Sequence, residues 1–443
     1  MTTPSSPSTP PSSSSAASAA SPSAPDASAA GAKPSIFRHQ GVAAFLIARL
    51  MAVVAQQVQA VVVAWQVYDL TREPLALAYV GLAQFIPMLL LLLPAGDLID
   101  RVSRKPILAA SWAVSAGCSL ALWWLSGHGS AGVTGIYAVL VVFGCSRAFS
   151  GPALQSLLPQ IVPREQLAQA IAANSMLLRI ASIGGPFLGG LLYGFGGATL
   201  TFLVCLVCFT IGTALLVTRV PVRFAPPLNP AAGNIWQRFG AGIHFIRTRP
   251  IILGTISLDL FAVLLGGVVA LLPIYAHEVL HAGPEGLGAL RSAMAVGEVT
   301  AGFYLSLRPF NRHVGKTMFA AVAVFGLANL TFSLSTTFWL SFAALAVAGA
   351  ADMVSVYIRG ALVQFSTPDE MRGRVNAVNM LFIGSSNELG EFRAGSAAAA
   401  LGAVPAAVTG ALCTLGVVAG WAALFKPLRT VDRFEEATPA VTR

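Results

Sequence analysis

Two similar stretches of sequence set the organisation of this chain. The first is PREQLAQAIAANSMLLRIASIGG at residues 163–185, and the second is PDEMRGRVNAVNMLFIGSSNELG at residues 368–390. They align at a constant offset of 205 residues, which pairs Pro163 with Pro368, Glu165 with Glu370, Asn174 with Asn379, Gly185 with Gly390 and, upstream, Gly144 with Gly349. The alignment predicts two related halves in the same orientation.

The composition around these stretches is that of a membrane protein. Of 443 residues 56% are hydrophobic and 10% are charged, and the mean hydropathy is +0.74. Soluble domains carry roughly 25% charged residues, because they must cover their surface with polar groups. The composition therefore excludes a soluble enzyme, a nucleic-acid binder and a secreted module. The five cysteines all lie in apolar runs, so no disulfide is predicted.

Long apolar runs predict the transmembrane helices, because about 20 residues cross the hydrocarbon core. Twelve runs are found, at residues 42–68, 76–98, 107–126, 133–157, 167–193, 199–219, 251–276, 287–307, 317–335, 338–364, 373–402 and 405–425. Strand-like alternation is absent, so the expected fold is all-α. Two six-helix halves in the same orientation are expected of an alternating-access transporter, with the site at the repeat interface.

The remaining segments predict the domain boundaries. Residues 1–40, rich in Ser, Pro and Ala, are expected to be a disordered cytoplasmic tail. The N-terminal bundle is predicted at 41–220, a cytoplasmic linker at 221–250, the C-terminal bundle at 251–426 and a cytoplasmic tail at 427–443.

The distribution of basic residues predicts the orientation. With the N-terminus in the cytoplasm, 20 of the 27 Lys and Arg residues fall on the cytoplasmic side, only Arg72 falls in an outer loop, and six lie within helices. The positive charge is thus explained by topology and anionic lipid, and not by nucleic acid. We predict a multi-pass protein of the inner (plasma) membrane with both termini in the cytoplasm.

A motif between the second and third runs gives the first sign of a family. The turn reads GDLIDRVSRK from Gly96 to Lys105, and its G-x-x-x-D-R-x-x-R-K spacing resembles the signature loop of the major facilitator superfamily. The resemblance implies a twelve-helix transporter fold and a cytoplasmic gate latch formed by Gly96, Asp100, Arg101, Arg104 and Lys105. A glycine there is expected to let the helix end approach its neighbour closely.

Two further patterns resemble the same superfamily. The stretch RAFSG, which starts at Arg147, is similar to an R-x-x-q-G pattern of the superfamily. In that superfamily the arginine of the pattern is linked to proton coupling. The stretch GPFLGG is similar to the core of the antiporter motif of exporters, through Gly185, Pro186, Gly189 and Gly190. Overall the chain looks most like the bacterial drug- and siderophore-efflux branch, which includes enterobactin exporters and macrolide efflux proteins.

Eleven charged residues are predicted inside the membrane, at Arg49, Arg147, Arg179, Arg291, Arg359, Arg393, Asp259, Glu298, Asp352, Glu388 and Glu391. Unpaired, they would cost about 30 kcal/mol in total, so they are expected to pair or to line water. Glu388 and Glu391 share one helix face, and two carboxylates so close cannot both ionise easily, which suits proton exchange. Asp259 is the second candidate for the proton site, and Arg179 is expected to pair with Glu298.

These observations predict a secondary transporter, and not an enzyme, that exports lipophilic or amphipathic small molecules by proton antiport. A monomer without cofactor or metal is expected. The proton path is assigned to Arg49, Arg147, Asp259, Asp352, Arg359, Glu388 and Glu391. One alternative is uptake or lysophospholipid transport by the same fold. A remote one is an intramembrane zinc protease, because His277-Glu-Val-Leu-His281 fits H-E-x-x-H; a polar helix end is the favoured interpretation.

Overall fold

Helices form every regular element of the described chain. The computed structural model describes residues 41–127, 132–162, 166–221 and 235–437. The long helices are α1 (Val42–Thr71), α2 (Pro74–Arg101), α3 (Arg104–Gly127), α4 (Val133–Ile161), α5 (Leu167–Arg219), α6 (Ile235–Thr248), α7 (Pro250–Gly266), α9 (Gly283–Leu307), α10 (Val314–Leu334), α11 (Phe338–Phe365), α12 (Asp369–Leu401) and α13 (Ala403–Leu424). The predicted disordered tail at 1–40 lies outside the described residues.

The helices match the predicted apolar runs. Nine helical stretches of the described chain are long and apolar enough to cross a membrane by length and composition. The charge-bearing helices α9 and α12 are not among the nine, and two predicted runs are joined in α5. The all-α membrane fold is confirmed, whereas the count of twelve crossings stays a prediction.

The helical backbone is interrupted at two places, between two predicted apolar runs in α5 and inside one run after α7. In α5 the backbone leaves the helical region at Gly197 (φ 66°, ψ −167°), a conformation open to glycine, so the element is two helices as predicted. The run predicted at 251–276 lies in one candidate span, Pro250–Val279, but its helix is interrupted. There α7 ends at Gly266, and the chain continues through a 3₁₀ turn (η4, Val269–Leu271), a short α8 (Leu272–Ile274) and a π-helical turn (η5, Tyr275–Val279).

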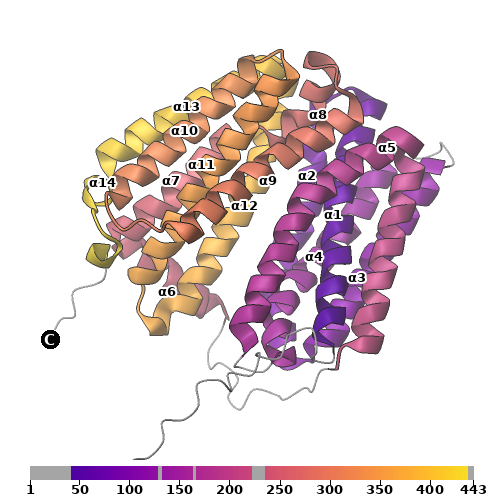
Figure 1. Ribbon diagram of the computed structural model, residues 1–443, viewed down its shortest axis with the longest axis horizontal. Helices are drawn as coiled ribbons and strands as arrows, with labels where there is room; N and C mark the ends of the chain where they lie inside the picture. Colours follow the sequence, from indigo (N-terminus) through magenta and orange to yellow (C-terminus); the bar gives the residue numbers. More distant parts are fainter. Residues whose placement is uncertain (1–40, 128–131, 163–165, 222–234, 438–443) are drawn as a thin grey trace, which may run out of the picture. The chain divides into compact units, whose positions relative to one another are not determined.

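The two halves pack in the same way (Figure 1). In the first half α1 contacts α5 and α2 contacts α4, while in the second α7 contacts α13 and α9 contacts α11. The aligned glycines occupy equivalent contacts: a Cβ on Gly144 of α4 would lie 2.3 Å from the Gln84 carbonyl of α2, and one on Gly349 of α11 would lie 2.1 Å from the Met294 carbonyl of α9. This shared packing supports the repeat found in the sequence.

The bundles meet through α5 with α9 and through α2 with α12. The contacts of Gly190 with Pro284 and of Gly395 with Pro74 lie toward the end where α1 finishes and α2 begins, which is called the outer end below after the predicted topology. There a Cβ on Gly190 would lie 2.5 Å from the Pro284 carbonyl. At the opposite, inner end, a Cβ on Gly96, Gly151, Gly360 or Gly373 would meet no described neighbour within 4 Å.

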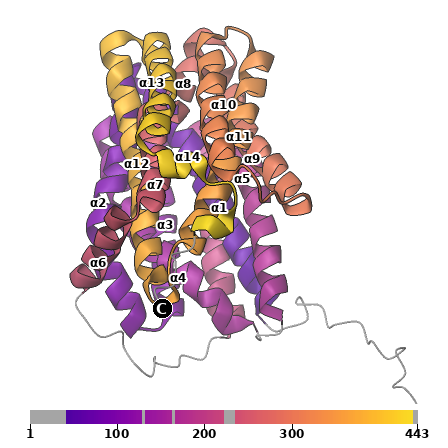
Figure 2. The same cartoon turned by 90° about the vertical axis from the view of Figure 1, so that its left-hand side faces the viewer.

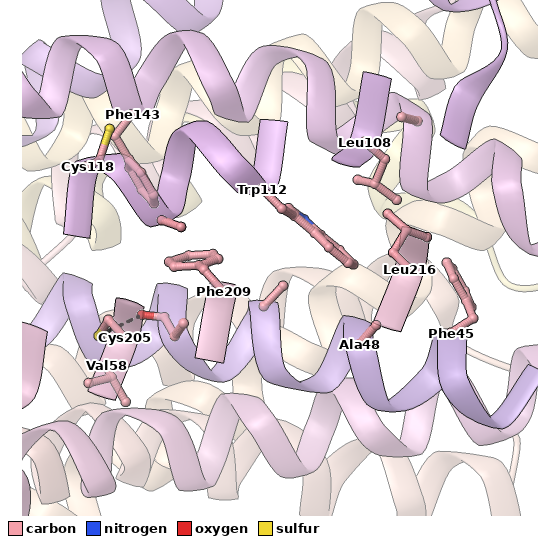
Figure 3. Close-up of a cluster of buried hydrophobic side chains, with 14 of the residues drawn as sticks. Phe45, Ala48, Val58, Leu108, Trp112, Cys118, Phe143, Cys205, Phe209 and Leu216 are labelled. Atoms are coloured by element: carbon pink, nitrogen blue, oxygen red, sulfur yellow. Dashed lines mark hydrogen bonds between the residues drawn. The ribbon is translucent and has the colours of Figure 1, made fainter. Parts of the chain in front are cut away.

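Apolar side chains from α1, α3, α4 and α5 form the core of the N-terminal bundle (Figure 3). Trp112 of α3 is buried beside Leu108, and Phe143 of α4 meets Phe209 of α5 edge-on at 6.4 Å between ring centroids. Cys205 lies in this core with its thiol 3.6 Å from the Ala55 carbonyl. This cysteine is a small packing residue, as its apolar run indicates.

Two segments predicted only as linker and tail contain structure. The linker includes α6, whose Ile243 and Ile246 pack against α7 and α12. After α13, the short α14 (Lys426–Thr430) and η6 (Phe434–Ala437) pack against α10 and α11 (Figure 2). Phe434 is buried there. These three helical elements were not predicted, because neither segment is long enough to suggest a span.

Candidate functional site

A central cavity of about 270 Å³ lies between the bundles. Its wall combines α1, α2 and α4 of the first half with η4, α9 and α12 of the second. Four glutamines and four charged side chains supply its polar surface: Gln56, Gln57, Gln59, Gln84, Arg147, Arg291, Glu388 and Glu391. The cavity can therefore hydrogen-bond a ligand on several sides while holding charge of both signs.

An ion pair crosses this cavity. Nη1 of Arg147 on α4 lies 3.6 Å from Oε1 of Glu388 on α12, and the same Nη1 donates a long hydrogen bond of 3.4 Å to Gln84. Both carboxylates of α12 face α2, since a Cβ on Gly81 would lie 3.5 Å from Glu388 and 3.7 Å from Glu391. The shared face predicted for Glu388 and Glu391 is thus found, and Arg147 links it to the other bundle.

A second cavity, called the side cavity below, lies within the C-terminal bundle. It has a volume of about 250 Å³ and is lined by residues of α7, η4, α9, α10, α11 and α12, among them Glu298, Asp352 and Glu391. Glu391 lines both cavities and so forms part of the wall between them. Asp352, a residue of the predicted proton path, therefore lines the side cavity and not the central one.

Asp259 and Arg359 form a separate buried pair. The Asp259 carboxylate of α7 is in contact with the Arg359 guanidinium of α11, and the two side chains are only 8% and 6% exposed. Neither residue lines the central or the side cavity. Arg49, on α1, is half-buried, and its Nε has no hydrogen-bond partner among the described residues. The structure does not bring these three together with Glu388.

The predicted pairing of Arg179 with Glu298 is confirmed. Nη1 of Arg179 on α5 lies 3.7 Å from Oε2 of Glu298 on α9, so this ion pair also joins the two bundles. Arg393 has a different role: its Nε donates a 2.9 Å hydrogen bond to the Leu264 carbonyl, near the end of α7. A cation at the C-terminal end of a helix is favourable, which explains this charge inside the bundle.

The glycines of the antiporter-like motif lie at helix contacts. A Cβ on Gly185 would lie 2.5 Å from the Gln57 side chain of α1, and one on Gly189 would lie 3.2 Å from Val58. Gly190 instead faces α9, where a Cβ on Gly288 would in turn lie 2.5 Å from the Pro186 carbonyl. The motif thus lets α5 approach both α1 and the opposite bundle.

The predicted gate loop is only partly engaged. Arg101 pairs with Asp97 one turn earlier at 3.0 Å, both well exposed, and Lys105 donates to the carbonyls of Val217 and Val220 at 3.0 and 2.7 Å. The close approach expected at Gly96 is not found, since a Cβ there would meet no described neighbour within 4 Å. The Asp100 side chain lies outside the described residues, and Arg104 has a buried Nε without a hydrogen-bond partner among them.

The H-E-x-x-H stretch does not have the geometry of a zinc site. His277 and Glu278 lie in the π-helical turn η5, and His281 has a positive φ of 47°, so the histidines are not presented on one α-helical face. The Arg72 guanidinium contacts the His277 ring, and the Tyr68 hydroxyl donates to Glu278. No group of three potential metal ligands occurs in the described part of the chain. These contacts instead join α1 to the opposite bundle at the outer end.

Several residues of the central cavity were not selected from the sequence. Gln84 and Gly81 lie on α2, and Phe143 lies on α4. Gln84 and Gly81 are three residues apart, so they lie on the same face of α2. Because α2 is apolar on all sides, its sequence has no polar stripe that would distinguish the face toward the cavity from the face toward lipid. Only the contacts of α2 with its neighbouring helices show which of its faces lines the cavity.

Comparison with known proteins agrees with this architecture. The model of the transmembrane secretion effector family matches residues 32–440. The chain is 25% identical over 417 residues to the enterobactin exporter EntS of Escherichia coli O1:K1, covering 91% of this chain and 95% of that protein. The EntS of Citrobacter koseri is 26% identical over 352 residues, which cover 77% and 81% of the two chains.

Solved transporters share the fold. A bacterial homologue of the iron transporter ferroportin, in an inward-facing state, superposes with a TM-score of 0.68 at 18% identity, covering 90% of this chain and all (100%) of the other. The nucleoside transporter NupG gives 0.68 at 12% identity, with 88% and 99% covered. The matched family and the transporters that share its fold transport molecules and are not enzymes. The chain is a multi-pass membrane protein that belongs to the transmembrane secretion effector family of the major facilitator superfamily.

Proposed function

We propose that this transporter exports an amphipathic small molecule of the drug or siderophore type, in exchange for protons. The observation that carries the proposal is the ion pair between Arg147 and Glu388, which joins the two bundles inside a polar cavity. Protonation of Glu388 removes one charge of the pair and so weakens the link across the cavity. A change of protonation then favours one arrangement of the bundles over the other.

The lining of the cavity indicates the class of substrate. Four glutamines, two arginines and two glutamates leave buried hydrogen-bonding groups that a purely lipophilic molecule would not satisfy. A molecule with several hydroxyl or amide groups attached to an apolar body fits better. The relatives are named as exporters of enterobactin, which makes this compound the first substrate to test.

The direction and location follow from the predicted topology. With both termini in the cytoplasm, the end at which the bundles are in contact faces outward, and the inner end is the one at which Gly96 and Gly151 have open space. Substrate then enters from the cytoplasm or the inner leaflet. The bacterial relatives named as exporters support the inner membrane as the location and export as the direction.

The test is transport by purified protein in proteoliposomes. In vesicles that hold the wild-type chain inside-out and are more acidic inside than outside, protons leave as substrate enters. Enterobactin or ethidium should therefore accumulate inside these vesicles. Glu388→Gln should lose gradient-driven accumulation but keep exchange of labelled for unlabelled substrate, since exchange needs no net proton movement. Glu435→Gln, which makes the same change on an exposed residue of η6, is the matched control and should transport as wild type.

Three outcomes would contradict the proposal. Gradient-driven transport that survives in Glu388→Gln would remove this residue from proton coupling. Accumulation only in right-side-out vesicles would support the uptake alternative. Movement of lysophospholipid, with no movement of enterobactin or ethidium, would favour the lipid-transport alternative.

A further inference from the structure

The side cavity carries an uncompensated negative charge. Of its three acids, Glu298 is paired with Arg179 at 3.7 Å, and Glu391 shares the central cavity with Arg147 and Arg291. Asp352 has no ion-pair partner among the described residues. An ionised carboxylate inside a helix bundle needs a counter-charge, because its desolvation is otherwise too unfavourable. A single positive charge is therefore missing from this cavity.

Two amide side chains line the same space, and the oxygen of one of them has no hydrogen-bond partner among the described residues. Asn329 of α10 is completely buried (0% exposed), and it lines the side cavity. Its Nδ2 donates to the Gly266 carbonyl at 3.4 Å, while its Oδ1 has no hydrogen-bond partner among the described residues. Asn387 of α12 adds a second amide to the lining. A buried amide oxygen left without a donor is unfavourable unless a cation or an ordered water meets it.

The interrupted helix supplies a further negative potential. The carboxyl end of α7, at Gly266, reaches the cavity wall, which continues through Gly267, Val268 and Val269. The end of a helix carries a partial negative charge, and broken helices in transporters place such ends against cations. Arg393 approaches α7 at the Leu264 carbonyl and lies against Gly410 of α13, and it is not part of the cavity lining. Arg393 therefore does not neutralise the negative end of α7 on the side that faces the side cavity.

We propose that the side cavity binds one sodium ion through the Asp352 carboxylate and the amide oxygens of Asn329 and Asn387. A proton would need only the carboxylate, whereas Na⁺ is a hard cation that uses several neutral oxygens and the space around them. A divalent or transition metal fits less well, because the described chain holds no cluster of three acidic, histidine or cysteine ligands. One missing charge matches one monovalent ion.

Sodium here would act on transport through Glu391. This residue lies in both walls, so a cation beside Asp352 lowers the negative potential at the central cavity. Sodium and proton would then influence each other's occupancy across a single side chain. This coupling rests on the proposed function, but sodium binding does not.

The test measures binding of radioactive sodium to the purified full-length chain in lipid nanodiscs, with choline chloride keeping the ionic strength constant. We expect one saturable class of sites in the wild type. Asp352→Asn removes a direct ligand and should weaken binding by at least the roughly 10- to 100-fold that loss of a supporting group causes at other metal sites, and Asn387→Ala should weaken it less. Glu435→Gln, which neutralises an exposed acid of η6 that lines neither cavity, should bind sodium as the wild type does.

Two results would overturn the proposal: no saturable binding by the wild type, or unchanged affinity in both Asp352→Asn and Asn387→Ala. Each variant is first shown to be monodisperse and to bind enterobactin or ethidium as the wild type does, so that loss of sodium is not loss of folding. Asn387 is exposed in the structure, which makes its variant the safer one. Sodium binding that persists when pH gradients drive no transport would reject the proposed function and leave the site intact.

Discussion

The ion pairs within one bundle differ from those between the bundles. Asp259 and Arg359, both in the C-terminal bundle, are in close contact and under 10% exposed. The pairs that join the bundles, Arg147 with Glu388 and Arg179 with Glu298, are separated by 3.6 and 3.7 Å and are 18–41% exposed. The difference indicates that a buried ion pair stabilises the C-terminal bundle permanently, whereas charge connects the two bundles only loosely, as rearrangement of the bundles requires.

The largest expected effect comes from breaking the buried pair. Asp259→Asn leaves the Arg359 guanidinium buried without its counter-charge, which costs about 3–5 kcal/mol when one partner of such a pair is removed. The melting temperature of the purified protein should fall accordingly. Replacing both residues by apolar ones, Asp259→Leu with Arg359→Met, should restore much of the stability, since it removes both buried charges.

The double variant decides between a structural and a proton-exchanging role for Asp259. If it is stable and still couples transport to a pH gradient, the pair is structural. A stable double variant without coupling would return Asp259 to the proton path, where the sequence placed it as the second candidate.

The next effect tests whether both bundles are packed alike. Gly144→Ala and Gly349→Ala each place a Cβ within 2.3 Å of a backbone carbonyl on the neighbouring helix, so something must shift. Overpacking of this kind costs about 1–3 kcal/mol, and the two variants should lower the melting temperature by similar amounts.

Gly151→Ala and Gly360→Ala lie on the same two helices with open space around them. They should be neutral or slightly stabilising, because alanine favours a helix over glycine by about 0.5–1 kcal/mol. If all four variants lowered the melting temperature equally, the close contacts of Gly144 and Gly349 would not be the cause of the loss of stability.

The outer contacts between the bundles should affect conformation more than stability. Tyr68→Phe removes the hydroxyl that donates to Glu278, and a hydrogen bond to a charged group contributes about 1.5–3 kcal/mol. The outward-open population should therefore rise by roughly tenfold or more. Spin labels at Leu70 and Leu401, in a chain with its cysteines replaced by serine, can measure this as a longer distance between α1 and α12.

Tyr79→Phe is the matched control for this measurement. It removes a hydroxyl from α2 but keeps the ring contacts with Tyr137 and Phe392, at 6.2 and 6.4 Å between centroids. If both variants shift the distance equally, the effect belongs to the loss of any hydroxyl there and not to the contact with Glu278.

The sequence predicted the fold far better than it predicted the site. Length and hydropathy are sufficient to locate helices, and the offset of 205 residues located Gly144 and Gly349 in equivalent contacts. Pairing of charges depends on helix rotation, which hydropathy does not encode in helices that are apolar all round. Arg359 lies on one stripe with Asp352, yet it pairs with Asp259 of another helix. The pairing of Arg179 with Glu298 was predictable because the fold implied which helices meet.

The interruption of α7 shows a second limit of the sequence. Gly266 and Gly267 precede Pro273 within an apolar run, and by composition the run reads as one span. The break depends on partners from elsewhere: the Asn329 amide donates to the Gly266 carbonyl, and the Thr414 hydroxyl donates to the Ala262 carbonyl at 3.1 Å. The Asn329 side chain of α10 thus satisfies a carbonyl that a continuous helix would have paired itself, and Thr414 of α13 adds a hydrogen bond to the last turn of α7.

The smallest effect is expected from the pair with the greatest exposure. Arg179 and Glu298 are 41% and 35% exposed and 3.7 Å apart, and solvent-exposed pairs contribute only about 0–1 kcal/mol. Glu298→Gln should therefore change the melting temperature by no more than about 2–4 °C, far less than Asp259→Asn does. A loss comparable to that of Asp259→Asn would show that the bundles are held together by this pair, and the distinction between permanent and separable contacts would fail. If stability is unchanged while the inward-facing population falls in the spin-label experiment, the pair contributes to the balance between conformations and not to the folding of either bundle.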